Sequence, residues 1–218
     1  MRVLVYDTET TGRPLNYLAP PSAGPNWPFI VQLAWAVIDL RIDRVVQQVS
    51  SVVRLPKGVL VEPEAAEIHG FTAEMTQAGQ SFPVVSAQFL AAAKNIDFCV
   101  CHNVGFDCPV VMSNLMRCQG YHDLIVGRTA HEFFGDIPHV CTMVESVEVC
   151  KIPIQMGRYK WPRLEELHNH LFGVGFEGAH DALADVMATT RCFLELRRLG
   201  LITTPGLSAT TTNKESTQ

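Results

Sequence analysis

The chain has 218 residues, 47% of them hydrophobic, and a formal net charge of −5. This composition excludes a disordered chain, and the length suits one α/β domain with a sizeable core. The negative charge argues against a protein that coats duplex nucleic acid through a broad basic surface. It does not exclude an enzyme that grips a few nucleotides in a cleft.

The sequence carries no sign of a membrane segment or of export. No apolar run reaches the roughly 18 residues that a membrane span needs, and the acidic Asp7 and Glu9 interrupt the layout of a signal peptide. Seven cysteines without a framework spacing fit reduced thiols. We therefore expect a cytoplasmic protein without membrane contact.

The first predicted element is a strand over residues 3–9, in which four apolar residues lead into Asp7 and Glu9. Residues i and i+2 of a strand share a face, so the two carboxylates lie side by side. Like charges that close repel unless a cation lies between them, and oxygen ligands favour Mg²⁺ or Mn²⁺. The alternative is a strand end that reaches solvent, where both acids are hydrated.

Residues 13–28 hold five prolines and cannot form a regular element. We expect a long loop at the mouth of the first strand, with Tyr17 and Trp27 as candidate contacts. Beside a metal site, such a loop is either a substrate lid or an inert excursion.

A hairpin and two helices are predicted next. Strands over residues 29–40 and 45–55 are separated by a short gap, which predicts antiparallel pairing. A helical turn over 64–68 ends at His69-Gly70, and Thr72 could cap a second short helix. The pattern over 84–94 predicts an amphipathic helix.

The middle of the chain predicts a central strand over residues 96–101, followed by a helix from about residue 106 to 119. Asp107 then lies in the first turn of a helix, at the carboxyl end of a central strand. Open α/β sheets place their ligands there. The alternative is that Asp107 only complements the helix dipole.

The last third of the chain predicts a short edge strand at 140–143 and a helix from Pro162 to Gly173. A long helix follows from Asp181 to Gly200, whereas segment 143–159 gives no clear assignment. The Ser/Thr-rich end of the chain predicts a loose tail.

His180 and Asp185 lie five residues apart, so on one helix they would not share a face. They converge only if His180 precedes the helix and Asp185 lies a turn inside it, with Asp181 as the N-cap. The sequence thus offers four carboxylates and one histidine, each near the end of an element.

Three short motifs occur in order: DTETTG at residues 7–12, HNVGFD at 102–107 and HDALAD at 180–185. They resemble the exonuclease motifs of the DEDDh family of 3′→5′ exonucleases, which includes polymerase proofreading subunits, ribonuclease T and oligoribonuclease. Ile68-His69-Gly70 also resembles the family's IHG turn. The resemblance implies an α/β, ribonuclease H-like fold with a mixed five-stranded sheet, its first three strands antiparallel, flanked by helices. Residues 1–202 would form the exonuclease domain and 203–218 a flexible polar tail.

The resemblance also implies roles for individual residues. Two divalent ions, Mg²⁺ or Mn²⁺, would be held by Asp7, Glu9, Asp107 and Asp185. His180 would be the general base, a task that suits an imidazole titrating near neutral pH. Further residues would contact the terminal nucleotide: Thr10, Thr11, Gly12, His69 and Asn103. For His69 and His102, a structural hydrogen-bonding role is the alternative to a substrate contact.

The expected activity is a metal-dependent 3′→5′ exonuclease that releases nucleoside monophosphates from single-stranded or frayed DNA. One alternative is an exoribonuclease on short RNA, and another, from a different class, is a non-catalytic nucleic-acid-binding adaptor. The sequence leaves open whether the protein has a polymerase or repair partner and whether it forms a homodimer.

Two further clusters have alternative interpretations. Cys99, Cys101, His102 and Cys108 could suggest a zinc site. No paired CxxC motifs accompany them, so we interpret the cysteines as core residues. A basic-aromatic cluster comprises Arg158, Tyr159, Lys160, Trp161 and Arg163. It could grip single strands by stacking and charge. The alternative is a solvated entry to the following helix, with Trp161 in the core.

Overall fold

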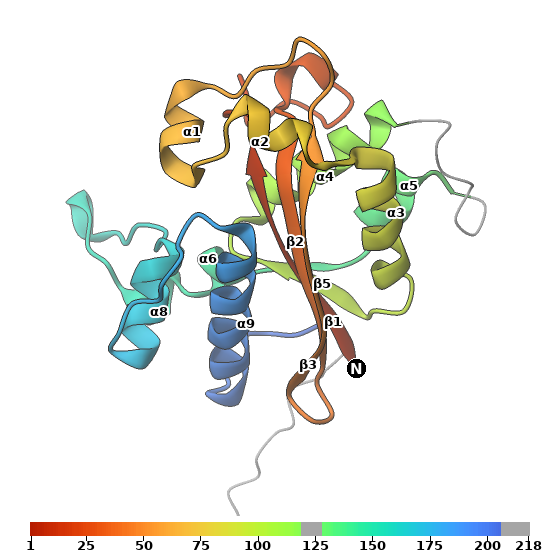
Figure 1. The fold of residues 1–218 in the computed structure, drawn as a ribbon. Coiled ribbons are helices and arrows are strands. Elements are labelled where there is room, and N and C mark those ends of the chain that lie inside the picture. Colours follow the sequence, from red (N-terminus) through yellow and green to blue (C-terminus); the bar gives the residue numbers. More distant parts are fainter. Residues whose placement is uncertain (119–127, 206–218) are drawn as a thin grey trace, which may run out of the picture.

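A mixed six-stranded sheet runs through the computed structural model, which describes residues 1–118 and 128–205 (Figure 1). The strand order is β4-β3-β2-β1-β5-β6. The strands are β1 (Arg2–Thr10), β2 (Ile30–Asp39), β3 (Arg44–Arg54), β4 (Gln80–Ser81), β5 (Phe98–Cys101) and β6 (His139–Cys141). The first three pair antiparallel, as predicted, whereas β5 joins β1 in parallel. The predicted count of five omitted β4, because its two residues are too few to show any pattern.

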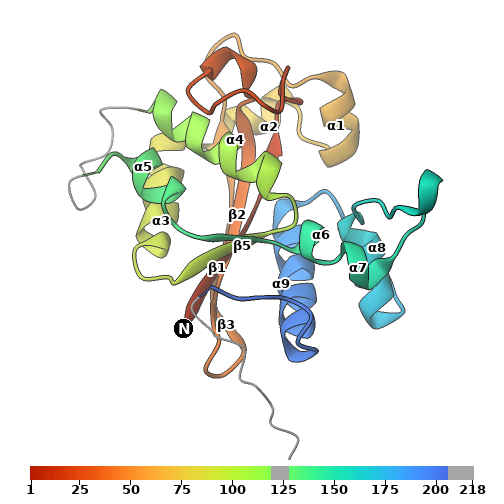
Figure 2. The same ribbon diagram turned by 180° about the vertical axis from the view of Figure 1, so that it is seen from behind.

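Side chains of β1 alternate between two hydrophobic cores, one on each face of the sheet. Leu4 and Tyr6 pack toward α3 (Phe82–Ala93), α4 (Val104–Arg117) and α5 (Ala130–Gly135), while Val3 and Val5 pack toward α8 (Leu164–Phe172) and α9 (Ala182–Arg198). Figures 1 and 2 show these two helical layers. By the same alternation, Asp7 and Glu9 lie on the α9 face of β1.

Small helices fill the remaining connections. These are α1 (Pro63–His69), α2 (Ala73–Gln77), α6 (Thr142–Glu145) and α7 (Val147–Cys150), with 3-10 turns at Gly24–Asn26 and Gln155–Gly157. The hydroxyl of Thr72 accepts from the N–H of Met75, which confirms the predicted cap of α2. The segment that the sequence left unassigned thus forms α6, α7 and a 3-10 turn. The edge strand ends two residues earlier than predicted because α6 begins at Thr142.

The proline-rich loop is irregular, as predicted, and its second half is tied to the body of the molecule. Trp27 is 2% exposed, and its indole N–H donates to the carbonyl of Pro20 at 3.0 Å. The guanidinium of Arg117, on α4, donates to the carbonyls of Gly24, Trp27 and Pro28. Trp27 is therefore a core residue of the loop, and not a surface contact.

All seven cysteines are free, and Cys99 and Cys101 are fully buried on one face of β5, as expected of core residues. In the part of the chain that the structure describes, no helix has both the length and the apolarity to cross a membrane. Most of the predicted C-terminal tail, residues 206–218, lies outside the described residues.

Candidate active site

The candidate site lies where the carboxyl ends of β1 and β5 meet. These strands are parallel, with Val3 opposite Phe98 and Val5 opposite Val100, so both run out at one edge of the sheet. β1 ends in the DTETTG motif, and β5 leads through the HNVGFD motif into α4. Asp107 is 3% exposed in the first turn of α4, where it accepts hydrogen bonds from the N–H and hydroxyl of Thr8, at 3.2 and 2.8 Å.

The start of α9 supplies the third part of the site. Asp181 is its N-cap and accepts from the N–H groups of Leu183 and Ala184. His180 precedes the helix with a φ of 69°, and its backbone N–H donates to Asp185 at 3.1 Å. The geometry that the sequence required of His180 and Asp185 is therefore confirmed.

The structure brings the five predicted catalytic residues together around one cavity of about 210 Å³. Its lining includes Asp7, Glu9, Asp107, His180 and Asp185. The potential ligand atoms of Glu9, His180 and Asp185 all lie within 4.8 Å of one another. Three segments far apart in the sequence thus converge on one small cavity.

Burial and mutual repulsion raise the pKa of every carboxyl group in this cavity. Burial, reinforced by Asp185 and Asp107, raises the pKa of Glu9 to about 8. Burial raises the pKa of Asp107 to about 7 and that of Asp185 to about 6, although hydrogen bonds from Thr8 and His180 oppose these shifts. Burial and then the charge of Asp107 also raise the pKa of Asp7. Four ionised carboxylates would therefore repel strongly here.

This donor set fits a divalent cation. The ion pairs found among the described residues involve other acids, so no lysine or arginine in residues 1–118 and 128–205 forms an ion pair with the four carboxyl groups. Carboxylate oxygens are the ligands that Mg²⁺ and Mn²⁺ prefer, and a cation between them would remove the repulsion. Asp7, Glu9, Asp107 and Asp185 are the residues that could hold such ions, with the imidazole of His180 beside them.

A larger cleft of about 500 Å³ adjoins this cavity and shares Glu9, Asn103, Phe106 and His180 with it. Of the residues predicted to contact substrate, four line the cleft: Thr10, Gly12, His69 and Asn103. Thr11 is buried and does not line it. Its hydroxyl accepts instead from the N–H of Phe29, which fastens the loop to β1.

His69 lies in the cleft wall with both ring nitrogens engaged by the backbone. Nε2 donates to the carbonyl of Thr10 at 3.0 Å, and Nδ1 accepts from the N–H of Phe71 at 3.1 Å. Burial lowers the pKa of His69, which agrees with a neutral ring. The ring thus fixes the backbone of the DTETTG turn against α1.

Several residues that shape the site carried no signal in the sequence analysis. Gln32 on β2 is 3% exposed, donates to Asp181 at 3.0 Å and accepts from the N–H of Ala182 at 2.9 Å, so it fixes the start of α9. Arg13 and Phe106 line the cleft. Tyr17, which the sequence analysis named as a candidate contact, also lines it and packs against Phe106 with ring centroids 6.4 Å apart. A buried glutamine in an apolar strand was the only local sign available for Gln32.

His102, the first residue of the second motif, has a structural role. Nε2 donates to the carbonyl of Pro162 and Nδ1 accepts from the hydroxyl of Thr142, both at 3.0 Å. Burial lowers the pKa of His102 to about 4, so the ring is neutral at physiological pH. It links the end of β5 to the segment that enters α8.

This histidine predicts a loss of stability in mild acid. The unfolded chain takes up a proton near pH 6.5, whereas folded His102 resists until about pH 4, so stability is lost as the pH falls through that window. His102 alone should cost about 2 kcal/mol of unfolding free energy between pH 7 and pH 5. Urea unfolding of the wild type and His102→Gln at both pH values isolates this contribution, because the carboxyl groups of the active site affect both proteins equally. His102→Gln should be less stable at pH 7 but should show a smaller loss on acidification, and an equal loss would contradict this role.

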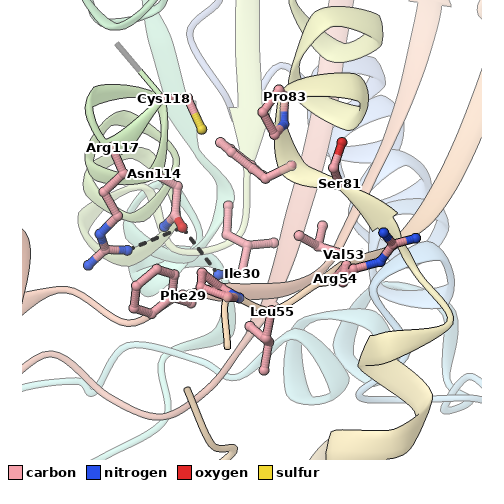
Figure 3. Close-up of a pocket in the computed structure, with 12 residues that line it drawn as sticks. Phe29, Ile30, Val53, Arg54, Leu55, Ser81, Pro83, Asn114, Arg117 and Cys118 are labelled. Carbon is pink, nitrogen blue, oxygen red and sulfur yellow. Dashed lines mark hydrogen bonds between the residues drawn. The ribbon is translucent and has the colours of Figure 1, made fainter. Parts of the chain in front are cut away.

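A separate pocket of about 320 Å³ lies away from these residues, between the ends of β2 and β3 and the start of α3 (Figure 3). Its walls are mostly apolar and include Phe29, Val53 and Leu55. The side chain of Asn114 lies at its edge and contacts Arg117 and the N–H of Ile30. None of the predicted catalytic residues lines it.

The fold is similar to that of exonuclease I. The *E. coli* enzyme in complex with a dT13 oligonucleotide is 20% identical, with a TM-score of 0.65, over 91% of this chain and 42% of its own. The zinc-bound *E. coli* enzyme with single-stranded DNA is 21% identical, with a TM-score of 0.66, over 91% and 40%. Exonuclease I from *Methylocaldum szegediense* is 22% identical, with a TM-score of 0.63, over 90% and 40%. The chain thus spans less than half the length of these proteins.

The chain belongs to the exonuclease family that is typified by ribonuclease T, because the sequence pattern of that family matches residues 4–193. Comparison with curated proteins gives no significant match. The family match confirms the predicted exonuclease family, and the structural matches confirm the predicted α/β fold with its mixed sheet flanked by helices. Membership also implies dependence on divalent metal ions.

Proposed function

We propose that this chain hydrolyses single-stranded or frayed DNA from its 3′ end, releases nucleoside monophosphates and uses two Mg²⁺ or Mn²⁺ ions. One observation carries the proposal. Four carboxyl groups and a histidine converge on a single cavity, and burial raises the pKa of all four carboxyl groups, as expected where mutually repelling groups are held together at a cost. A site that binds cations offsets this cost, whereas an adaptor without metal would gain nothing from it.

Within this function, each residue has a definite task. Asp7, Glu9, Asp107 and Asp185 would hold the ions, which supply an activated water and neutralise charge on the leaving oxygen. His180 would take the proton of that water. Its backbone is fixed by the bond to Asp185 and its ring is exposed toward the cleft, so it can pass the proton on to solvent.

The adjoining cleft would take the terminal nucleotide. Thr10 and Gly12 line this cleft together with Glu9, and the aromatic ring of Phe106 would offer a surface for a base. DNA is the proposed polymer because exonuclease I, which shares the fold, has been observed with dT13 and dA16 oligonucleotides.

The test is digestion of 5′-labelled single-stranded DNA and RNA of one sequence, with Mg²⁺, Mn²⁺ or EDTA. We expect a ladder that shortens from the 3′ end in the presence of metal, with DNA cut faster than RNA. Faster cleavage of RNA would establish the exoribonuclease alternative. Absence of cleavage with every metal, together with absence of Mn²⁺ binding in a calorimetric titration, would favour the non-catalytic adaptor.

A further inference from the structure

A basic arm, residues 151–163, extends from the body of the molecule beside the candidate active site. It contains four lysines and arginines and no acidic residue, in a chain whose net charge is −5. Figures 1 and 2 both show the segment between α7 and α8 projecting away from the sheet and its helices. The arm therefore concentrates positive charge on one small surface.

The backbone of the arm is ordered by its own hydrogen bonds. Ile154 donates to the carbonyl of Arg158 at 2.8 Å, and Lys160 donates to the carbonyl of Ile152 at 3.0 Å. Pro153 and Tyr159 form an isolated antiparallel bridge between the same two stretches. The chain thus doubles back on itself, which holds the side chains at its tip and base in fixed relative positions.

Large apolar and aromatic side chains of the arm are exposed to solvent. Trp161 is 65% exposed and Met156 is 88% exposed, whereas the other two tryptophans, Trp27 and Trp35, are buried. The alternative that placed Trp161 in the core is therefore wrong. Exposed aromatic surface among the cations of the arm is unusual for a solvated loop and indicates a binding surface.

The arm is continuous with the catalytic cleft. The carbonyl of Pro162 accepts from His102 at the floor of the site, and Arg163 lines the cleft together with Glu9 and His180. The cleft lining also includes Glu62 and Glu64, at the start of α1, which make that part of its wall acidic. A phosphate backbone that leaves the metal cavity would be repelled by this acidic wall and attracted past Arg163.

We propose that the arm binds the single-stranded nucleic acid on the 5′ side of the terminal nucleotide. Trp161 stacks on a base and Arg158 pairs with the phosphates. Lys160 contributes less charge because it is 2.6 Å from Glu166 in an ion pair. The inference rests on the proposed function, since it assigns the path of the strand that the cavity would hydrolyse.

Intrinsic fluorescence tests the arm without any need for hydrolysis. Trp161 is the exposed tryptophan of the three, so its emission should be quenched when a base stacks on it. The probe is an oligonucleotide of about 12 thymidylates, the upper part of the site-size range of single-strand binding surfaces, added in EDTA and in Ca²⁺. Unchanged fluorescence at saturating oligonucleotide would overturn the proposal.

Kinetics with substrates of two lengths provide the second measurement. Trp161→Ala and Arg158→Gln should each raise the KM for the oligonucleotide about tenfold, because one stacked base or one phosphate contact is lost. The kcat at saturation should stay within about twofold, and hydrolysis of the p-nitrophenyl ester of thymidine 5′-monophosphate, which is too short to reach the arm, should not change.

The matched control is Arg44→Gln, which removes an exposed arginine at the distant turn between β2 and β3. It should leave the KM for both substrates unchanged. An equal KM in all three variants and the wild type would overturn the proposal that the arm binds nucleic acid. Concentration-dependent dimerisation that Trp161→Ala abolishes would also overturn it, because the arm would then be a self-association surface. If the wild type hydrolyses neither substrate, the exonuclease proposal fails, while oligonucleotide quenching still decides the arm.

Discussion

Asp7→Asn should lower exonuclease activity by about 10³-fold, because loss of one metal ligand removes several kcal/mol of transition-state stabilisation. The same substitution should raise the thermal stability of the metal-free protein. Asp7 lies beside the other three carboxyl groups, and burial and their charges raise its pKa. An uncharged asparagine of the same shape relieves this repulsion without leaving a cavity.

The gain in stability should depend on pH and on metal. A carboxyl group whose pKa is raised on folding contributes stability while it is protonated and loses it as the pH rises. The advantage in melting temperature of metal-free Asp7→Asn over the metal-free wild type should therefore grow between pH 5 and pH 8. The opposing effect of His102 is the same in both proteins and cancels. With saturating Mn²⁺ the order should reverse, because the wild type then binds more metal.

Glu148→Gln is the control for this comparison, since it removes one negative charge from an exposed position on α7, outside the cavity. It should change neither the activity nor the response of the melting temperature to metal. A lower stability of metal-free Asp7→Asn than of the metal-free wild type at pH 8 would contradict the prediction. The carboxyl cluster would then be stabilised by contacts within the fold, and the argument for a cation site would be lost.

Most of the framework of the site could be predicted because its signals are local. The apolar run before Asp7, the N-cap at Asp181 and the glycine cap at Gly173 each act within a few residues, and the structure has all three. The requirement that His180 precede its helix also followed from helical geometry alone. Local chemistry therefore located every carboxylate at the end of an element.

Long-range contacts are the part that the sequence could not supply. Gln32 reaches Asp181 and Ala182 across about 150 residues of chain, and nothing near Gln32 in the sequence specifies that partner. The two-residue strand β4 exists only because β3 offers it an edge. The exposure of Trp161 likewise depends on where the arm leaves the body, so the sequence left open whether this tryptophan lies in the core or on the surface.

His180→Asn should lower activity by about 10²–10⁴-fold, the usual range for loss of a general base, while Mn²⁺ binding is retained. Among residues with a side chain, asparagine tolerates the left-handed φ of 69° at this position well, and it keeps the backbone N–H that donates to Asp185. The fold of the loop before α9 is therefore preserved, and the imidazole alone is removed.

Two measurements separate the roles that the geometry allows for His180. Its potential ligand atoms lie within 4.8 Å of those of Glu9 and Asp185, so the ring is close enough to bind a metal itself. If His180 is the base, calorimetric titration should give equal Mn²⁺ affinity for the wild type and His180→Asn, and the acidic limb of the pH–rate profile that reports imidazole should be lost. Weaker Mn²⁺ binding in the variant would instead make His180 a metal ligand. The water would then have to lose its proton to a carboxylate or directly to solvent.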